Sequence, residues 1–162
     1  MASVSQQTPF TPPIGSGTTL WNDISTARNA SFGISESNYL FTWGANGTGQ
    51  LGDGTITSRS SPVQIGASYT EDSLAAYALS TGTNLFSWTQ IASTISAMAG
   101  ITSDGSLWTW GVGSLGELGN NQTILPVSYP TKLGTSSWSS IHVGSTHFAA
   151  IRSDGLLFAW GS

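Results

Sequence analysis

With 162 residues, of which 38% are hydrophobic and seven are Trp, the chain is the size of one domain and has enough apolar material for a packed core. Only 7% of the residues are charged and the net charge is -4, so the cationic patch that a phosphate backbone requires is missing and we expect no nucleic-acid partner. The absence of Cys excludes disulfides and thiolate metal sites, and the absence of an apolar run of roughly 18 to 20 residues predicts no membrane insertion.

Residues 1–19 precede the patterned part of the chain and carry three of its six Pro but no Lys or Arg. The pair Pro12-Pro13 lacks amide donors and favours polyproline geometry, so this segment is predicted to be an extended N-terminal arm. An arm of this kind gains stability by ordering against a neighbouring subunit. We therefore take Phe10, Pro12 and Pro13 as candidate contacts with a protein partner.

A repeat occupies residues 20–162, and its copies start near residues 21, 88 and 138. Each copy has Trp, Ile three residues later, a second Ile ten further on and a closing Trp nine after that. The matched positions are Trp21, Ile24, Ile34 and Trp43, then Trp88, Ile91, Ile101 and Trp110, then Trp138, Ile141, Ile151 and Trp160. Because Trp is rare and no gap is needed, we predict that these tryptophans are structural and pack in the core rather than forming a ligand cage. We expect Trp108, which has Phe at the matching positions, to pack as well.

Each copy also contains two apolar runs around a turn, which predicts a β-hairpin. The turn is Asp104-Gly105 in the second copy and Asp154-Gly155 in the third, where Gly tolerates the positive φ of a tight turn. The first copy has Ser37-Asn38 instead, and Asn also tolerates the left-handed region, so we expect the hairpin to form there too.

Two copies continue into a glycine-rich segment, WGANGTGQLGDG from Trp43 and WGVGSLGELGNN from Trp110. Neither has the Lys-Ser/Thr pair or the following helix of a phosphate-binding loop, so they are interpreted as turns. A PVQIG run at Pro62 and a PTKLG run at Pro130 come next, whereas the third copy stops at FAWGS, before its glycine-rich turn.

The first two copies start 67 residues apart and the last two 50 apart, so the surplus forms an insertion at residues 67–87. An insertion between repeats protrudes as a loop or hairpin, and its adjacent acids Glu71 and Asp72 are the candidate partner-specific element. A competing alignment remains open, because LFSW ending at Trp88 is similar to LFTW ending at Trp43. On that alignment residues 74–88 are a shortened extra strand pair.

The order W-x-x-I, hairpin, L-x-x-W-G, glycine-rich turn and P-x-x-I/L-G resembles the repeat of the regulator-of-chromosome-condensation family, over about residues 20–162. That resemblance implies an all-β fold of four-stranded antiparallel propeller blades. It also implies seven blades in a closed ring, whereas this chain holds about three, so an incomplete ring with two apolar faces and open strand edges is expected. Either the chain is part of a longer one, which we favour, or other chains complete the ring, or a partner covers the ends.

No catalytic, cofactor-binding or metal-binding residue emerges from the sequence, so we expect no enzyme activity and no cofactor. His142 and His147 are the only histidines and have no carboxylate near them in sequence. The resemblance places His147 at a position where that family often has a structural His that hydrogen-bonds locally. The carboxylates Asp53, Asp104 and Asp154 occur at turns, where Asp caps its own backbone.

Three functions remain as hypotheses. We favour a non-enzymatic structural or binding protein, for instance a neck, tail or fibre component of a bacterial virus, because the chain is nearly uncharged and rich in Ser, Thr and Gly. Its partners would be other subunits of an assembly or a surface receptor, and a virion or extracellular location is favoured over the cytoplasm. The resemblance suggests instead a guanine-nucleotide-exchange or other regulatory propeller, although the arm lacks the basic residues for chromatin. A propeller enzyme is least supported, because no nucleophile or acid pair is found.

Overall fold

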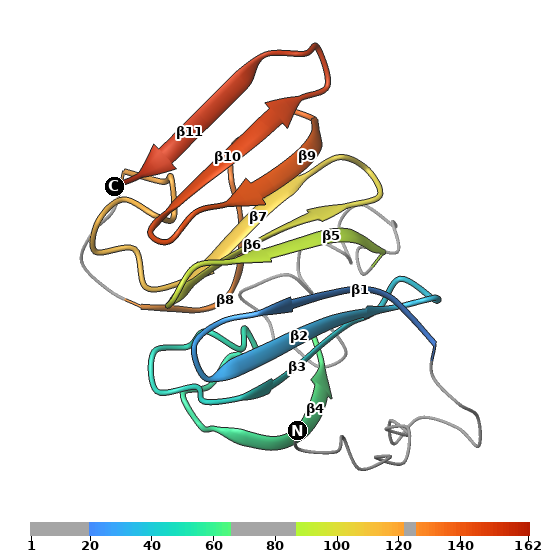
Figure 1. The fold of residues 1–162 in the computed structure, drawn as a ribbon, viewed down its shortest axis with the longest axis vertical. Coiled ribbons are helices and arrows are strands. Elements are labelled where there is room, and N and C mark those ends of the chain that lie inside the picture. Colours follow the sequence, from blue (N-terminus) through green and yellow to red (C-terminus); the bar gives the residue numbers. More distant parts are fainter. Residues whose placement is uncertain (1–19, 66–86, 122–125) are drawn as a thin grey trace, which may run out of the picture.

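The computed structural model describes residues 20–65, 87–121 and 126–162, and within these ranges the chain forms β-strands and no helix (Figure 1). The strands make three antiparallel sheets, which confirms the predicted all-β fold and the incomplete ring of propeller blades. The first sheet contains β1 (Trp21–Thr26), β2 (Ala30–Ser35), β3 (Leu40–Gly44) and β4 (Arg59–Gln64). The second contains β5 (Trp88–Ser93), β6 (Ala97–Thr102), β7 (Leu107–Gly111) and β8 (Val127–Lys132). The third contains β9 (Trp138–Val143), β10 (His147–Arg152) and β11 (Leu157–Gly161).

The opening tryptophan of each copy has the same place in its sheet. Its Cα partners on the second strand are Ser35 for Trp21, Thr102 for Trp88 and Arg152 for Trp138, each beside a shift in register. Trp88 therefore opens the second sheet. Residues 67–86 of the predicted insertion, including Glu71 and Asp72, lie outside the described residues, as does the predicted arm with Phe10, Pro12 and Pro13.

The predicted hairpin turns form in all three sheets, and they share one geometry. The amide of the third loop residue donates at 2.8 Å to the carbonyl that ends the preceding strand, and that third residue has a positive φ. It is Gly105 (φ 79°) in the second sheet, Gly155 (φ 90°) in the third and Asn38 (φ 62°) in the first. Asn thus replaces Gly in the left-handed region, as its sequence position predicted.

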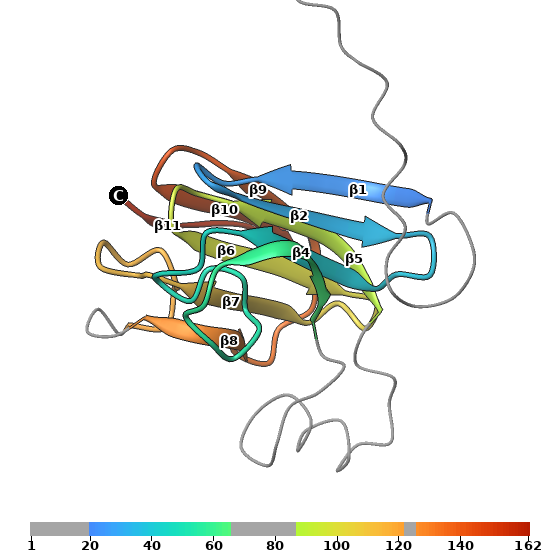
Figure 2. The same ribbon diagram turned by 90° about the horizontal axis from the view of Figure 1, so that it is seen from below.

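The three sheets stack face to face, with the inner strands β1, β5 and β9 adjacent to one another (Figures 1 and 2). We call the side of each sheet that faces the next one its front face and the opposite side its back face. Two apolar clusters fill the two seams. The first joins Phe32, Ile34 and Leu40 of the first sheet to Trp88, Met98 and Trp110 of the second. The second joins Ala97, Ile101 and Leu107 to Ile141, Phe148 and Ala150, with Trp160 packed against it.

The closing tryptophan of a sheet reaches back across the seam to the preceding sheet. Trp110 is fully buried, and its indole Nε1 donates to the Gln50 carbonyl at 2.9 Å. Trp160 repeats the contact one sheet later, donating to the Glu117 carbonyl at 2.8 Å. Both acceptor carbonyls lie in a glycine-rich turn. These turns therefore bind the tryptophan of the next sheet and fix its position.

An amide side chain joins the inner strands of the second and third sheets. Gln90 Nε2 donates to the Ser139 carbonyl at 3.1 Å, and Gln90 Oε1 accepts from the Ile141 amide at 3.0 Å. The side chain therefore acts as one residue of a β-ladder between two separate sheets. The first sheet has the shorter Asp23 at this position, whose carboxylate accepts from the neighbouring Ile24 amide instead.

Replacing the seam tryptophan tests this arrangement. Trp110→Phe removes the indole donor and leaves the Gln50 carbonyl unpaired beside a small cavity, so we expect a loss of about 2 kcal/mol in the free energy of unfolding. Urea unfolding measures it. The matched control is Trp21→Phe, on the open back face of the first sheet, which should cost less than about 1 kcal/mol. Equal losses of unfolding free energy for the two variants would show that the contact of Trp110 in the seam does not stabilise the fold more than the exposed Trp21 does.

Candidate interaction surface

The front face of the third sheet is uncovered within the described residues, and it carries aliphatic residues together with two histidines. Its register assigns to this face the residues that match the buried positions Ala92, Ala97, Ala99, Ile101 and Leu107 of the second sheet. These are His142, His147, Ala149, Ile151 and Leu157. Leu157 has 71% of its surface exposed and Ile151 has 37%, whereas the matching Leu107 and Ile101 are 0% and 2% exposed. The third sheet thus presents to solvent the kind of surface that the second sheet buries.

The edge of the same sheet is open as well. In the first sheet the Leu40 carbonyl accepts from the Ile65 amide, and in the second the Leu107 carbonyl accepts from the Leu133 amide, both at 2.8 Å. The matching residue of β11 is Leu157, and among the described residues no strand lies beside β11 on that side. An unpaired edge next to an exposed apolar face is a template for adding another strand.

The opposite end of the stack has a second uncovered face. On the back face of the first sheet Trp21 is 36% exposed and Ile24 is 67% exposed, while the matching Trp88 and Ile91 of the second sheet are 0% and 7% exposed. Trp21 packs edge-on against Phe41, with ring centroids 5.6 Å apart, and lies over Gly33. One end of the stack therefore exposes a front face and the other a back face. These are the two kinds of face that pack against each other in the seams.

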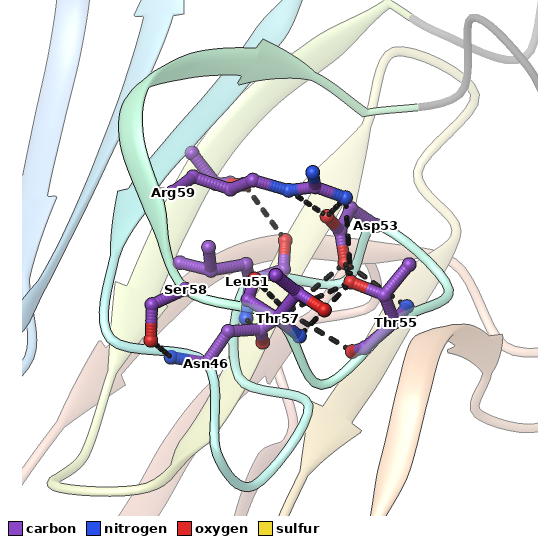
Figure 3. A network of polar contacts seen from close by, with 8 residues as sticks. Asn46, Leu51, Asp53, Thr55, Thr57, Ser58 and Arg59 are labelled. Atoms are coloured by element: carbon purple, nitrogen blue, oxygen red, sulfur yellow. Dashed lines mark hydrogen bonds and ion pairs between the residues drawn. The ribbon is translucent and has the colours of Figure 1, made fainter.

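The glycine-rich turn of the first sheet is held by a polar network (Figure 3). Asn46 is fully buried at its centre, and its Nδ2 donates to Asp53 Oδ1 at 3.0 Å and to the Thr57 carbonyl at 3.1 Å. Asn46 Oδ1 accepts from the Leu51 amide at 2.9 Å. Arg59 closes the network, its Nε donating to Asp53 Oδ2 at 2.7 Å. Every polar group named here has a partner, so this cluster fixes the turn and offers no free ligand.

The network also sets the charge of its carboxylate. Burial alone would raise the pKa of Asp53, but hydrogen bonds from Thr55 and Arg59, together with the Arg59 charge, outweigh it and hold the pKa below its ordinary value. The pKa of Asp104 is lowered in the same way: burial opposes the shift, and hydrogen bonds from Thr102 and Ser106 outweigh burial. Both carboxylates therefore cap turns as anions, which is a structural use of Asp.

In the described part of the chain, the side chains that could take part in catalysis or metal binding do not form a common site. His142 and His147 are exposed, and His147 lies beside Gly144, whose amide donates to the His147 carbonyl at 2.8 Å. Asp154 pairs with Arg152 inside its own turn, with Arg152 Nη2 and Asp154 Oδ2 2.6 Å apart. Within the three described ranges no group of three His, Cys, Asp or Glu side chains is placed to hold a metal ion. No helix there is long and apolar enough to cross a membrane.

The sequence predicted exposed apolar faces and open strand edges at the ends of the stack, but it did not identify Ile151 and Leu157 as the exposed residues. Aligning Leu157 with Leu107 and Ile151 with Ile101 shows which residues a further sheet stacked on the third would cover. Gln90 and Asn46 were also missed, because their roles depend on distances between segments that the repeat alone does not reveal.

Comparison with known proteins agrees with the blade geometry. The sequence profile described as "Regulator of chromosome condensation (RCC1) repeat" matches residues 37–75 and 104–151, which together make up more than half of the chain. The chain belongs to the RCC1 repeat family. A search of curated proteins gives no match.

Three solved structures are similar to this RCC1-repeat chain. Human WBSCR16 is 20% identical with a TM-score of 0.70, over 90% of this chain and 33% of that one. Prp20p from Saccharomyces cerevisiae, described with its binding to Gsp1p and histones, is 23% identical with a TM-score of 0.65, over 87% and 33%. Yeast RCC1 (Prp20) bound to Kap60 is 22% identical with a TM-score of 0.63, over 87% and 32%. At these identities the likeness shows the fold, and the RCC1-repeat chain spans about a third of the length of each.

Removing the central amide of the network should destabilise the first sheet. Asn46→Ala leaves the Leu51 amide and the Thr57 carbonyl buried without this partner, so we expect a loss of about 2 to 4 kcal/mol in the free energy of unfolding. The exposed Asn22→Ala is the matched control and should change that free energy by less than about 0.5 kcal/mol. Thermal or urea unfolding of both variants measures the difference, and similar values for the two would rule out the network as an anchor.

The lowered pKa of Asp53 predicts an acid dependence of stability. Because the folded pKa lies below the unfolded one, the stabilisation is present above the unfolded value, near 3.8, and is lost as the pH falls through the folded value. Wild type should therefore lose more stability than Asp53→Asn between pH 7 and pH 3. Urea unfolding at a series of pH values tests this, and parallel curves for the two proteins would contradict it.

Proposed function

We propose that this RCC1-repeat chain is a protein-binding module that acts without catalysis, through the front face and open edge of its third sheet. The observation that carries the proposal is the exposure of Leu157, at 71%, where the matching Leu107 of the second sheet is fully buried. An exposed face that carries Ile151 and Leu157 beside an open strand edge binds protein more readily than a small molecule, because it offers backbone hydrogen bonds along a strand.

The charge pattern supports a protein partner of apolar character. The front-face residues of the third sheet include two histidines but no Lys, Arg, Asp or Glu, so docking there desolvates no carboxylate, ammonium or guanidinium group. The similar structures also support a protein as the class of partner. Prp20p is described with binding to Gsp1p and histones, and yeast RCC1 is described as bound to Kap60. Protein binding is thus the function that the face and the family support together.

Two narrower functions stay hypotheses. Regulation of a small GTPase, by guanine-nucleotide exchange or otherwise, is supported by the family, whose member Prp20p binds Gsp1p by its description. A neck, tail or fibre protein of a virion, in a virion or extracellular location, is supported by the low charge and by the arm at residues 1–19. The regulatory hypothesis has the stronger support, because it rests on family membership and the other on composition.

Substitution on the face tests the proposal. Leu157→Asp places a charge on this face beside the open edge, whereas Leu156→Asp changes another exposed Leu, 53% exposed, in the adjacent turn. Wild type, Leu156→Asp and Leu157→Asp are immobilised separately, and each is exposed to the same mixture of host extract and concentrated untagged chain. Wild type and Leu156→Asp should retain the same proteins from this mixture. Leu157→Asp should retain at least tenfold less of them. Equal retention by all three would overturn the assignment of this face.

A further inference from the structure

We propose that Asn46 is a latent site of spontaneous deamidation, which the folded glycine-rich turn of the first sheet protects and which reacts when that turn opens. The products carry aspartate or isoaspartate at residue 46, and neither can restore the turn. This inference goes beyond the proposed function and needs no partner. Three observations carry it: the residue that follows Asn46, the hydrogen bonds of its side chain, and the oxygens that surround it.

The chemistry follows from the neighbour of Asn46. Asn46 and Gly47 form the one Asn-Gly pair in the sequence. In deamidation the Gly47 nitrogen loses its proton and attacks Asn46 Cγ, so that a bond forms between that nitrogen and Cγ while the bond from Cγ to Nδ2 breaks and ammonia leaves. Water then opens the cyclic imide to aspartate or isoaspartate. Glycine hinders the attack least, because it has no Cβ, and a Cβ added at Gly47 would meet no atom within 4 Å.

The folded turn blocks this reaction by holding both polar atoms of the side chain. Asn46 Nδ2 donates to four acceptor oxygens on Asp53, Thr55 and Thr57, at 3.0 to 3.3 Å (Figure 3). Oδ1 accepts from the Leu51 amide at 2.9 Å, and the residue is fully buried. Expulsion of Nδ2 breaks these bonds, and burial keeps out the water that opens the imide. The rate therefore follows the population of molecules in which the turn is open.

The same surroundings explain why the product cannot rebuild the turn. Deamidation replaces the Nδ2 donor by an oxygen that only accepts, and this oxygen would face the Thr57 carbonyl and the Asp53 carboxylate. Because the pKa of Asp53 lies below its ordinary value, the two carboxylates would repel each other where a 3.0 Å hydrogen bond was before. The Gln50 carbonyl that binds the Trp110 indole belongs to this turn. Opening followed by reaction thus makes the loss of the first seam irreversible.

Two arginine variants separate opening of this turn from other effects. Arg59→Ala removes the donor that holds Asp53 Oδ2 at 2.7 Å and leaves the Asn-Gly pair intact. Arg152→Ala is the matched control, because it removes the pair with Asp154 in the third sheet. Folded proteins are incubated at mildly alkaline pH, and conversion of the Asn46 amide to an acid is followed by peptide mass spectrometry. Arg59→Ala should react about tenfold faster than wild type, which corresponds to about 1.4 kcal/mol in the free energy of opening, and Arg152→Ala at the wild-type rate.

The urea-unfolded chain gives the unprotected rate. Wild type, Arg59→Ala and Arg152→Ala should react at one common rate in urea, at least about tenfold faster than folded wild type. Gly47→Ala should react much more slowly than these three in urea, because its methyl group hinders the attack. Asn46→Asp copies one product and should unfold at a lower urea concentration than wild type, whereas the exposed Asn22→Asp should unfold at the wild-type concentration.

Three results would each overturn the inference. Equal rates at Asn46 for folded and urea-unfolded wild type would show that the turn gives no protection. Equal rates for folded Arg59→Ala and wild type would show that the network around Asn46 does not control the reaction. A wild-type urea midpoint for Asn46→Asp would show that the product rebuilds the turn. The interaction face is tested separately, because retention of proteins through Leu157 does not depend on residue 46.

Discussion

The packing of an indole against the preceding sheet is the contact on which the rest of the structure depends. Trp110 and Trp160 each fill a seam and donate to a carbonyl in the glycine-rich turn of the sheet before, at Gln50 and Glu117. The contact requires a turn that exposes its carbonyl and lets the ring approach closely. Gly52 provides this, because its φ is +72° and a Cβ there would collide with the Trp110 indole. Each sheet in this chain is therefore stabilised by the sheets stacked against it. Within the described residues, the first and the third sheet each have one face without such a neighbour.

The low charge of the chain follows from this architecture. A sheet inside the stack buries both faces, so a charged side chain on either face would have to lose its hydration. Two ion pairs in the described ranges each join a carboxylate in a turn to an arginine at the end of a strand, Asp53 to Arg59 and Asp154 to Arg152. The low charge of the chain and the stacking of its sheets thus have one cause, and the carboxylates of both ion pairs lie in turns.

The sequence predicted the strands, the hairpins and the family because these depend on local patterns repeated three times. The equal spacing from Trp21 to Trp43 and from Trp88 to Trp110 indicates one strand geometry, and Asn38 adopts the left-handed turn conformation for the reason its chemistry suggests. The sequence did not predict the bridge that Gln90 makes to the third sheet, or the network around Asn46. Those contacts join segments whose separation depends on how sheets stack and turns fold back. Exposed faces at the ends of the stack were expected from the number of repeats, but Ile151 and Leu157 were not identified, because their repeat positions are the same as those of core residues.

Hydrogen exchange on the Leu157→Asp variant tests most directly whether neighbouring sheets stabilise one another. The charge of Asp at this position disfavours docking of any partner on the front face of the third sheet, so each sheet keeps only the neighbours of its own chain. If stacking is the source of stability, the backbone amides of β5, β6 and β7, covered on both faces, should exchange most slowly, and those of β10 and β11 fastest. Equal protection of all three sheets would show that each is stable by itself and would contradict the account.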